Sequence, residues 1–354
     1  MWDLETLGFA TSFADAFRRF EGRERVPGRV AASGRGLHVV LAAEGEILCS
    51  VPGRLRHGAS AGELPVTGDW VVVAALPGET RGTIQAVLPR RTALSRKAAG
   101  EATREQVLAA NVDAVFLVCG LDRDFNPRRI ERALVVARGS GALPVVVLNK
   151  ADLCDDLGRH LAAARAAAAG VPVHAVSSLA GEGLEALFPY LGRGRTVVLL
   201  GSSGAGKSTL TNRLAGHDVQ PTGEVRTADG RGRHTTSRRE LIPIPAGGWV
   251  LDTPGIRELQ LWGGEDTPAS AFGDVAALAA GCRFADCGHL GEPACAVRDA
   301  ISEGRLAEDR LEAFRKLSRE LERLESRQEG WRREEEARKL RTVHRQGRRF
   351  RPRG

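Results

Sequence analysis

The sequence predicts an α/β protein in which a parallel-sheet domain lies between a small N-terminal β-barrel and a helical C-terminal segment. Three observations indicate this arrangement. Short β-type runs occupy residues 26–91, strand and helix patterns alternate from residue 111 to 262, and three of the six cysteines cluster near the C-terminus. With 354 residues the chain exceeds what one hydrophobic core usually organises, so we expect two or three domains.

Composition is that of an ordinary folded protein. Hydrophobic residues make up 42% and charged residues 27%, which excludes a wholly disordered or collagen-like chain. No run approaches the roughly 18 to 20 apolar residues of a membrane helix, and the N-terminus lacks a basic segment followed by an apolar one. We therefore expect a cytoplasmic protein that makes no membrane contact.

The first 95 residues divide into an N-terminal extension and a barrel. Residues 1–25 place phenylalanines at roughly helical spacing, which predicts a short amphipathic helix. Residues 26–95 contain five short β-type runs broken by Gly and Pro, and this pattern predicts a five-stranded OB-like barrel. Such barrels often bind oligonucleotides. The alternative is a packing module without a ligand.

Residues 96–266 predict an α/β domain. Strands rich in Val and Leu alternate with helices, as expected for a parallel sheet that helices cover on both faces. The strands are expected at residues 112–120, 144–150, 171–178, 195–201 and 248–255. Ligands of such sheets bind at the carboxyl ends of the strands, so the residues that follow the strands are the functional candidates.

A glycine-rich loop follows the strand at 195–201 and opens a helix. It comprises Gly201, Ser202, Ser203, Gly204, Ala205, Gly206, Lys207, Ser208 and Thr209. This GxxxxGKS pattern predicts a phosphate-binding P-loop, in which Lys207 bridges the β and γ oxygens and the Ser208 hydroxyl ligates magnesium. A glycine-rich turn without a ligand would not require Lys207 followed by Ser208.

The strand at 144–150 leads into a motif that indicates guanine recognition. The motif is Asn149, Lys150, Ala151 and Asp152. The Asp152 carboxylate can accept hydrogen bonds from both the ring N1–H and the exocyclic amine of guanine, donors that adenine does not offer in that arrangement. The alternative is that Asp152 only caps a helix, but a P-loop in the same domain favours the guanine site.

Two further strands end in residues that suit the same ligand. Ser177 and Ser178 end one of them and are expected to support the base through backbone N–H groups. Asp252 follows the other and can hold a magnesium-bound water, while the Gly255 N–H can meet the γ-phosphate. The expected ligand is therefore GTP with Mg²⁺.

Three cysteines and one histidine near the C-terminus form a predicted metal site. They are Cys282, Cys287, His289 and Cys295. Four nitrogen and sulfur ligands complete a tetrahedral zinc site and leave no open position, which favours one structural Zn²⁺ in residues 267–325. The alternative is a loop that binds no metal.

The C-terminus is strongly basic. A charged helix is expected from about residue 302 to 340, and residues 326–354 form a basic helix and tail. Residues 330–354 contain nine Arg and one Lys against three Glu, a net charge equal to the +7 of the whole chain. Such a tail suits a polyphosphate partner such as nucleic acid, or is simply a solvated helix end.

The order of the motifs indicates a circular permutation. In ordinary GTPases the P-loop comes first and the guanine motif late, whereas here the guanine motif precedes the P-loop. From about Val26 to Lys316 the chain resembles the ribosome small-subunit-dependent GTPase A family (RsgA, also called YjeQ). The matching stretches are 222–224, 232–236, DTPGIRELQLW at 252–262 and CRFADCGHLGEPACAV at 282–297.

The resemblance implies an OB barrel, a permuted GTPase and a zinc-binding C-terminal domain. It also implies a role in late maturation of the small ribosomal subunit, so the expected partners are that subunit, its rRNA and GTP or GDP. We expect the chain to be a monomer. Two departures are modest. Ser237 replaces a frequent third threonine and Ser178 a usual alanine, and neither removes a needed hydroxyl or backbone donor.

Hydrolysis requires a group that orients the attacking water, and the glutamine usual in Ras-like GTPases is missing. The residue after the DTPG glycine is Ile256, which can neither accept nor donate a hydrogen bond. His234 is therefore the catalytic candidate beside Lys207, and Thr235 or Thr236 is expected to complete magnesium coordination. The alternative is that His234 is a surface residue needed only for ribosome binding.

The sequence thus predicts a slow GTPase, a hydrolase acting on the phosphoric anhydride of GTP. The small subunit is expected to stimulate hydrolysis, which drives release. One alternative is a protein in which GTP gates rRNA binding without meaningful turnover. Another is a P-loop ATPase or small-molecule kinase, against which Asp152 argues.

Overall fold

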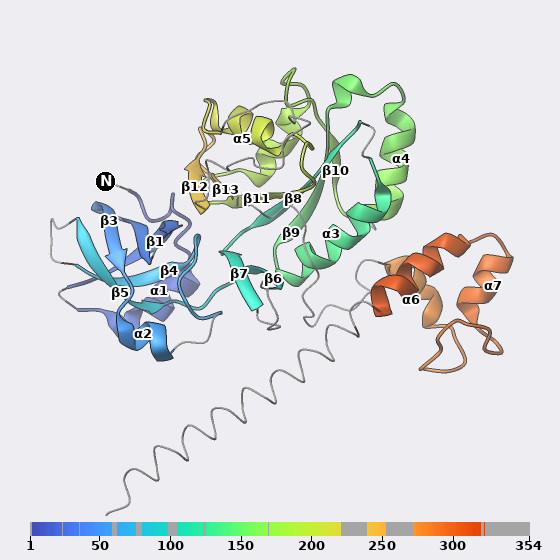
Figure 1. Ribbon diagram of the computed structural model, residues 1–354, viewed down its shortest axis with the longest axis horizontal. Coiled ribbons are helices and arrows are strands. Elements are labelled where there is room, and N and C mark those ends of the chain that lie inside the picture. The colour runs from blue at the N-terminus through green and yellow to red at the C-terminus, as the bar shows by residue number, and fades with distance from the viewer. Residues whose placement is uncertain are drawn as a thin grey trace, which may run out of the picture.

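A barrel, a central α/β sheet and a small helical part follow one another along the chain (Figure 1). The computed structural model describes residues 2–22, 24–34, 36–58, 62–75, 80–97, 105–122, 125–168, 170–220, 239–252, 272–319 and 322. Within these ranges no helix is both long and apolar enough to cross a membrane.

Five strands close the N-terminal barrel, which confirms the expected OB-like form. They are β1 (Arg25–Gly34), β2 (Leu37–Ala42), β3 (Gly45–Ser50), β4 (Trp70–Ala74) and β5 (Arg81–Val87). Their order is β1-β2-β3-β5-β4, and β4 pairs back to β1. β3 and β5 run parallel, and α2 (Gly53–Gly58) lies between β3 and β4 in the chain. Val30, Val40 and Ile84 belong to the buried core of the barrel.

The N-terminal segment contacts both the barrel and the central sheet. It forms α1 (Thr11–Phe17) and the 3-10 turn η1 (Arg18–Phe20). Phe13 is buried against Trp70 of the barrel, with ring centroids 5.8 Å apart. The Trp2 ring lies 5.5 Å from that of Trp249 in the central sheet. The predicted short helix is confirmed, and this segment joins two parts of the molecule.

The central sheet contains five parallel strands and one antiparallel strand. They are β8 (Ala114–Gly120), β9 (Leu143–Asn149), β10 (Val173–Ala175), β11 (Thr196–Leu200), β13 (Trp249–Asp252) and β12 (Arg239–Pro243). The order is β10-β9-β8-β11-β13-β12, and β12 runs antiparallel to β13. The parallel sheet expected from the Val- and Leu-rich runs is therefore confirmed.

Helices cover both faces of this sheet. They are α3 (Pro127–Gly139), α4 (Leu157–Ala168) and α5 (Lys207–Ala215), with 3-10 segments η2 (Ala151–Leu153) and η3 (Leu184–Tyr190). In β8, Val115 shares a core cluster with Leu134 of α3, whereas Phe116 shares one with Leu210 of α5. Because successive strand residues point to opposite faces, α3 and α5 cover different faces (Figure 1).

The sequence does not predict β12 or the hairpin of β6 (Ala93–Lys97) and β7 (Glu105–Ala110). β12 pairs with β13 on one side and with β1 on the other, through Ala32 with Glu240 and Ser33 with Arg239. The barrel and the central sheet therefore form one continuous eleven-stranded sheet. No local sequence pattern predicts this pairing, because β12 is short, ends in proline and pairs with a strand that is distant in sequence.

The C-terminal part packs against α3. It contains α6 (Gly273–Ala279), α7 (Ala296–Ser302) and a helix over residues 308–319. The predicted charged helix thus begins at residue 308 rather than about 302, because Gly304 takes a φ of +72° in the turn after α7. Val135 of α3 belongs to the core cluster of this part. The rest of the predicted helix and the basic tail lie outside the described residues.

Candidate functional site

The carboxyl ends of the parallel strands meet at one edge of the central sheet. β11 pairs with β8 on one side and with β13 on the other. The loop after β11 therefore shares this edge with Asn149 at the end of β9, Ser177 beyond β10 and Asp252 at the end of β13. The predicted nucleotide-binding residues within the described ranges thus lie where open α/β sheets bind ligands.

The glycine-rich loop is shaped by close contacts as well as by turn geometry. Gly201, Gly204 and Gly206 take φ angles of +157°, +83° and +88°. A Cβ atom at Gly201 would lie 2.1 Å from the Val118 carbonyl oxygen, and one at Gly206 would lie 2.2 Å from Asn149 Nδ2. Side chains at these two positions would push the loop away from β8 and from the base motif.

Lys207 is the first residue of α5, and its ammonium group stays close to the loop. The Nζ atom donates hydrogen bonds to the carbonyl oxygens of Gly201 at 2.9 Å and Ser202 at 2.6 Å. Ser208 follows in the first turn of α5 and is partly exposed. The loop therefore presents a cation, a hydroxyl and a helix N-terminus together, a combination that suits a phosphate group.

Asn149 is a hub between three loops and is only 2% exposed. Its Nδ2 donates to the Ala205 carbonyl oxygen of the phosphate loop at 2.9 Å. Its Oδ1 accepts from the Ser178 backbone N–H at 3.0 Å and from the Ser178 hydroxyl at 2.8 Å. One buried side chain thus fixes the base motif to the phosphate loop and to the loop after β10.

Asp152 is exposed at the mouth of the site and is oriented by Ser177. The buried Ser177 hydroxyl donates to Asp152 Oδ1 at 2.5 Å. The Ser177 backbone N–H donates to the Glu182 carbonyl at 2.9 Å. In this structure, therefore, the two serines act on Asp152 and Asn149, and both of their backbone N–H groups bond to protein atoms.

Arg213 and Asp122 make contacts in this site that the sequence did not predict. Arg213, in the last turn of α5, donates to the carbonyl oxygens of Ser178 at 2.9 Å and Leu179 at 2.6 Å, so the helix after the phosphate loop holds the loop after β10. Asp122 accepts from Lys150 Nζ at 2.5 Å. No sequence signal marks either residue, because each is an ordinary charge in a polar stretch.

The predicted residues that follow β13 and the loop before β12 are only partly described. Asp252 is the last residue of β13. The loop residues expected to sense the γ-phosphate, orient water and complete magnesium coordination lie outside the described residues. They are His234, Thr235, Thr236 and Gly255.

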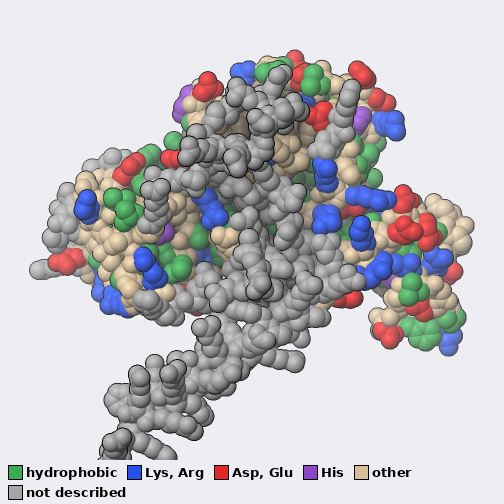
Figure 2. All heavy atoms as spheres, viewed as in Figure 1, with side chains coloured by type: hydrophobic (Ala, Val, Ile, Leu, Met, Phe, Trp, Pro, Cys, Tyr) green, Lys and Arg blue, Asp and Glu red, His purple; other side chains and the backbone are tan. Residues whose placement is uncertain are grey.

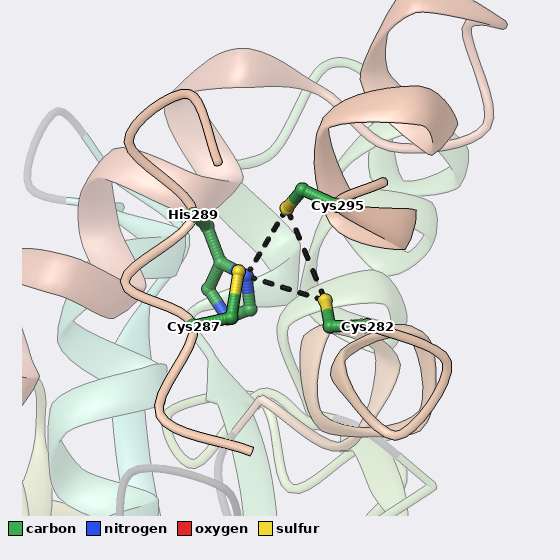
Figure 3. A group of neighbouring side chains, drawn as sticks. All are labelled: Cys282, Cys287, His289 and Cys295. Atoms are coloured by element: carbon green, nitrogen blue, oxygen red, sulfur yellow. Dashed lines mark hydrogen bonds between the residues drawn. The ribbon is translucent and has the colours of Figure 1, made fainter. Parts of the chain in front are cut away.

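The predicted metal ligands converge in the C-terminal part (Figure 3). The ligand atoms of Cys282, Cys287, His289 and Cys295 all lie within 4.8 Å of one another. The Sγ atoms of Cys282 and Cys295 are 3.9 Å apart, and His289 Nδ1 lies 3.6 Å and 3.4 Å from them. A zinc tetrahedron has edges of about 3.8 Å between sulfurs and about 3.5 Å between sulfur and nitrogen. The four residues therefore fit a zinc ion.

The surroundings favour the metal-binding protonation state at two of the four residues, Cys282 and His289. Burial opposes thiolate formation at Cys282, but backbone N–H groups of Val297 and Ala296 at the start of α7 bring its pKa below the ordinary value. Burial, with the Arg315 cation, lowers the pKa of His289, which favours the neutral imidazole that ligates metals. Cys282 and His289 thus favour their metal-binding forms, whereas burial raises the pKa of the Cys287 thiol to about 11.

A carboxylate holds the loop that carries Cys287 and His289. Glu292 accepts hydrogen bonds from the N–H groups of Gly288 at 2.9 Å, Leu290 at 2.7 Å and Gly291 at 3.0 Å. Donation by its own N–H, and then by these three groups, lowers the pKa of Glu292 to about 2. Sequence reasoning missed this residue, because an acidic residue beside Gly and Pro reads as an ordinary turn.

The fold and these loops define a class of protein. The base motif after β9 precedes the phosphate loop after β11 in the chain, so the central domain is a circularly permuted P-loop GTPase. An OB-like barrel precedes it, and a Cys/His cluster that could bind zinc follows it.

Comparison with known proteins gives the family. A family model described as RsgA GTPase matches residues 87–262. A small ribosomal subunit biogenesis GTPase RsgA from Opitutus terrae is 52% identical over 327 residues, 90% of this chain and 89% of that protein. One of the same name from Syntrophotalea carbinolica is 44% identical over 99% of this chain and 98% of its own. The chain belongs to the RsgA GTPase family and is a GTPase.

A solved structure agrees with this assignment. YjeQ from Thermotoga maritima is 30% identical in sequence, covers 84% of this chain and 98% of its own, and superposes with a TM-score of 0.62.

Proposed function

We propose that this GTPase binds the small ribosomal subunit during its late maturation, that the subunit stimulates GTP hydrolysis, and that hydrolysis drives release. The observation that carries the choice of nucleotide is the 2.9 Å bond from Asn149 to the Ala205 carbonyl. This bond joins the base motif, which contains the Asp152 carboxylate suited to guanine, to the loop suited to phosphates. The two therefore belong to one nucleotide site.

Each side chain of the site has a proposed role. Asp152, held by Ser177, accepts the two guanine donors. Lys207 leaves the loop carbonyls and bridges the β and γ oxygens, where it stabilises charge that develops in the transition state. His234 orients the attacking water, because Ile256 cannot do so. Gly255 meets the γ-phosphate through its N–H.

Magnesium is the proposed companion of GTP. Ser208 in the first turn of α5 and Asp252 at the end of β13 present oxygen donors at the same sheet edge, which suits this hard cation. With Thr235 or Thr236, these residues would hold it. The bound ion would neutralise charge on the β and γ oxygens.

Zinc is proposed as one structural ion per chain. Three thiols and an imidazole, whose ligand atoms lie within 4.8 Å of one another, would fill the four positions of a zinc ion and leave none for a substrate or water. The C-terminal part has a small apolar core, so the ion would contribute to its folding.

The ribosomal partner is proposed from relatives and from surface charge. Two relatives carry the name small ribosomal subunit biogenesis GTPase. Figure 2 shows Lys and Arg side chains gathered where the central domain meets the C-terminal helices, and α3 exposes Arg128, Arg129 and Arg132. Such a surface suits an rRNA backbone. We place this function in the cytoplasm and assign it to a monomer.

We also propose a division of the chain into functional parts. The N-terminal extension spans residues 1–25 and the OB-like barrel residues 26–95. The GTPase domain spans residues 96–266, the zinc-binding domain residues 267–325, and the basic helix and tail residues 326–354.

The experiment that tests this proposal is GTP turnover by the full chain with and without purified small subunits. Large subunits serve as the control for general ribosome contact. Turnover that rises only with small subunits is the expected result. Equal turnover under all conditions, with GTP-dependent binding to small subunits, would support the second candidate, an assembly protein whose rRNA affinity GTP gates without meaningful hydrolysis. Competition between GTP and ATP separates both from an ATPase or kinase.

A further inference from the structure

An ion pair spans two loops at the edge of the proposed base site. Lys150 Nζ donates to Asp122 Oδ2 at 2.5 Å, and the two side chains are 28% and 33% exposed. Asp122 lies just beyond β8, and Lys150 lies between the hub residue Asn149 and the base-recognising Asp152. The pair is therefore half-buried and adjacent to two residues with proposed nucleotide roles.

The backbone of both loops is arranged around this pair. The Leu121 N–H donates to the Asn149 carbonyl at 2.8 Å, so the residues that precede Asp122 and Lys150 are bonded to each other. A Cβ atom at Gly120 would lie 3.2 Å from Asp122 Oδ1, so a side chain there would crowd the carboxylate. Lys150 has a φ of +65°, a left-handed conformation that lysine rarely adopts and that neighbouring contacts must maintain.

We propose that Asp122 is a positioning residue for guanine nucleotides that acts through Lys150, an inference that rests on the proposed function. A lysine side chain has many rotamers, and its four-carbon stem offers an apolar surface when its ammonium is anchored. Asp122 anchors the ammonium at the end of β8, the strand that lies between β9 and β11, while Lys207 supplies a separate cation to the phosphate loop. The Lys150 stem is thereby ordered for contact with the base before the nucleotide arrives.

The expected effect follows from the cost of ordering one long side chain on binding. Asp122→Ala should weaken GTP and GDP binding by about 3- to 10-fold, the equivalent of ordering one rotamer-rich side chain. The two nucleotides should lose affinity by the same factor, because they share the base. Binding isotherms of the full chain with GTP and with GDP measure this.

A double-mutant cycle separates positioning from a purely structural effect. If Asp122 acts through Lys150, then Asp122→Ala should add nothing to the loss already caused by Lys150→Ala. Asp155→Ala is the matched control, since Asp155 is an exposed acidic residue near the same loop, and it should bind nucleotides like the wild type. Unchanged affinity in Asp122→Ala, or losses that add in the double variant, would overturn the inference.

Asp152→Asn, measured in parallel, distinguishes this inference from the proposed function. A loss of GTP affinity in Asp152→Asn with none in Asp122→Ala overturns the role of Asp122 alone. Unchanged GTP affinity in Asp152→Asn overturns the guanine site on which both rest.

Discussion

At the scale of single residues, the proposed nucleotide site depends most on Asn149. Its buried amide donates to the phosphate loop and accepts from both the backbone and the hydroxyl of Ser178. An aliphatic side chain at this position would leave the Ala205 carbonyl and the Ser178 donors without these partners.

Asn149→Ala should therefore cost about 1–3 kcal/mol of unfolding free energy and weaken GTP and GDP binding by about tenfold or more. Thermal unfolding and nucleotide titration measure the two effects. Asn126→Ala is the control, because Asn126 is an exposed helix cap whose side chain accepts from the Arg128 N–H at 3.0 Å in the first turn of its own helix. Equal behaviour of the two variants would refute the hub role.

Binding and chemistry should separate at two other residues. Lys207→Ala should lose both nucleotide affinity and turnover, since its ammonium belongs to the phosphate loop. His234→Ala should keep GTP affinity but lower subunit-stimulated turnover by about 10- to 1,000-fold, as expected when a positioning or proton-transfer group is lost. Single-turnover hydrolysis on saturating small subunits measures this, and wild-type rates in His234→Ala would assign the role to another group.

At the scale of elements, the loop that carries Cys287 and His289 shows how a carboxylate can organise candidate metal ligands. Glu292 gathers three N–H groups of the loop, and His289 and Ala294 take φ angles of +57° and +58° that ordinary residues rarely adopt. Arg315 also donates to the His289 carbonyl from the helix at 308–319. The loop is thus held in a strained form that presents His289 to the cysteines.

The purified protein should contain one zinc per chain, and Cys287→Ala should disorder the C-terminal part before the central domain.

Glu292→Ala should keep the ligands but release zinc to a chelator at least about tenfold faster, the scale on which supporting residues change metal affinity. Glu303→Ala is the matched acidic control, since Glu303 pairs with Arg305 outside the loop. Absence of zinc in wild type, or equal release by both variants, would contradict this account.

Elements also show what the sequence could and could not reveal. The sequence predicts the barrel strands, the parallel strands and the Cys/His cluster, because hydrophobic alternation, Val-rich runs and ligand spacing are local patterns. It does not predict β12 and its pairing with β1, because a short strand gains its place from a partner distant in sequence. The same reason hides Arg213 and Asp122, whose partners lie in loops that only the fold brings near. Glu292 is missed for another reason, because its partners are the adjacent residues of a stretch that looks like an ordinary turn.

At the scale of the whole molecule, Arg310 connects the C-terminal part to the GTPase domain. Its side chain is 14% exposed, pairs with Glu131 of α3 and with Asp274 of α6, and lies 4.3 Å from the Phe272 ring centroid. Burial raises the pKa of Glu131 even though Arg310 opposes this effect. A charged Glu131 carboxylate would therefore destabilise the fold if Arg310 were removed.

Arg310→Met should loosen this junction and cost about 1–3 kcal/mol, the usual penalty for a buried group that loses a charged hydrogen-bond partner. Limited proteolysis and thermal unfolding should show earlier cleavage and melting of the C-terminal part. Arg305→Met is the control, because Arg305 is exposed and pairs only locally with Glu303 among the described residues. If both variants resist the protease equally, the junction does not depend on Arg310.

The most direct test of the whole account is the nucleotide that Asp152 selects. Asp152→Asn presents one acceptor and one donor in place of two acceptors, so the variant should lose GTP affinity and prefer xanthosine triphosphate. Small-subunit-stimulated turnover of both nucleotides by wild type and variant is the measurement. Wild type should hydrolyse GTP and the variant xanthosine triphosphate, each stimulated by small subunits. Wild-type GTP affinity and turnover in Asp152→Asn would contradict the guanine site.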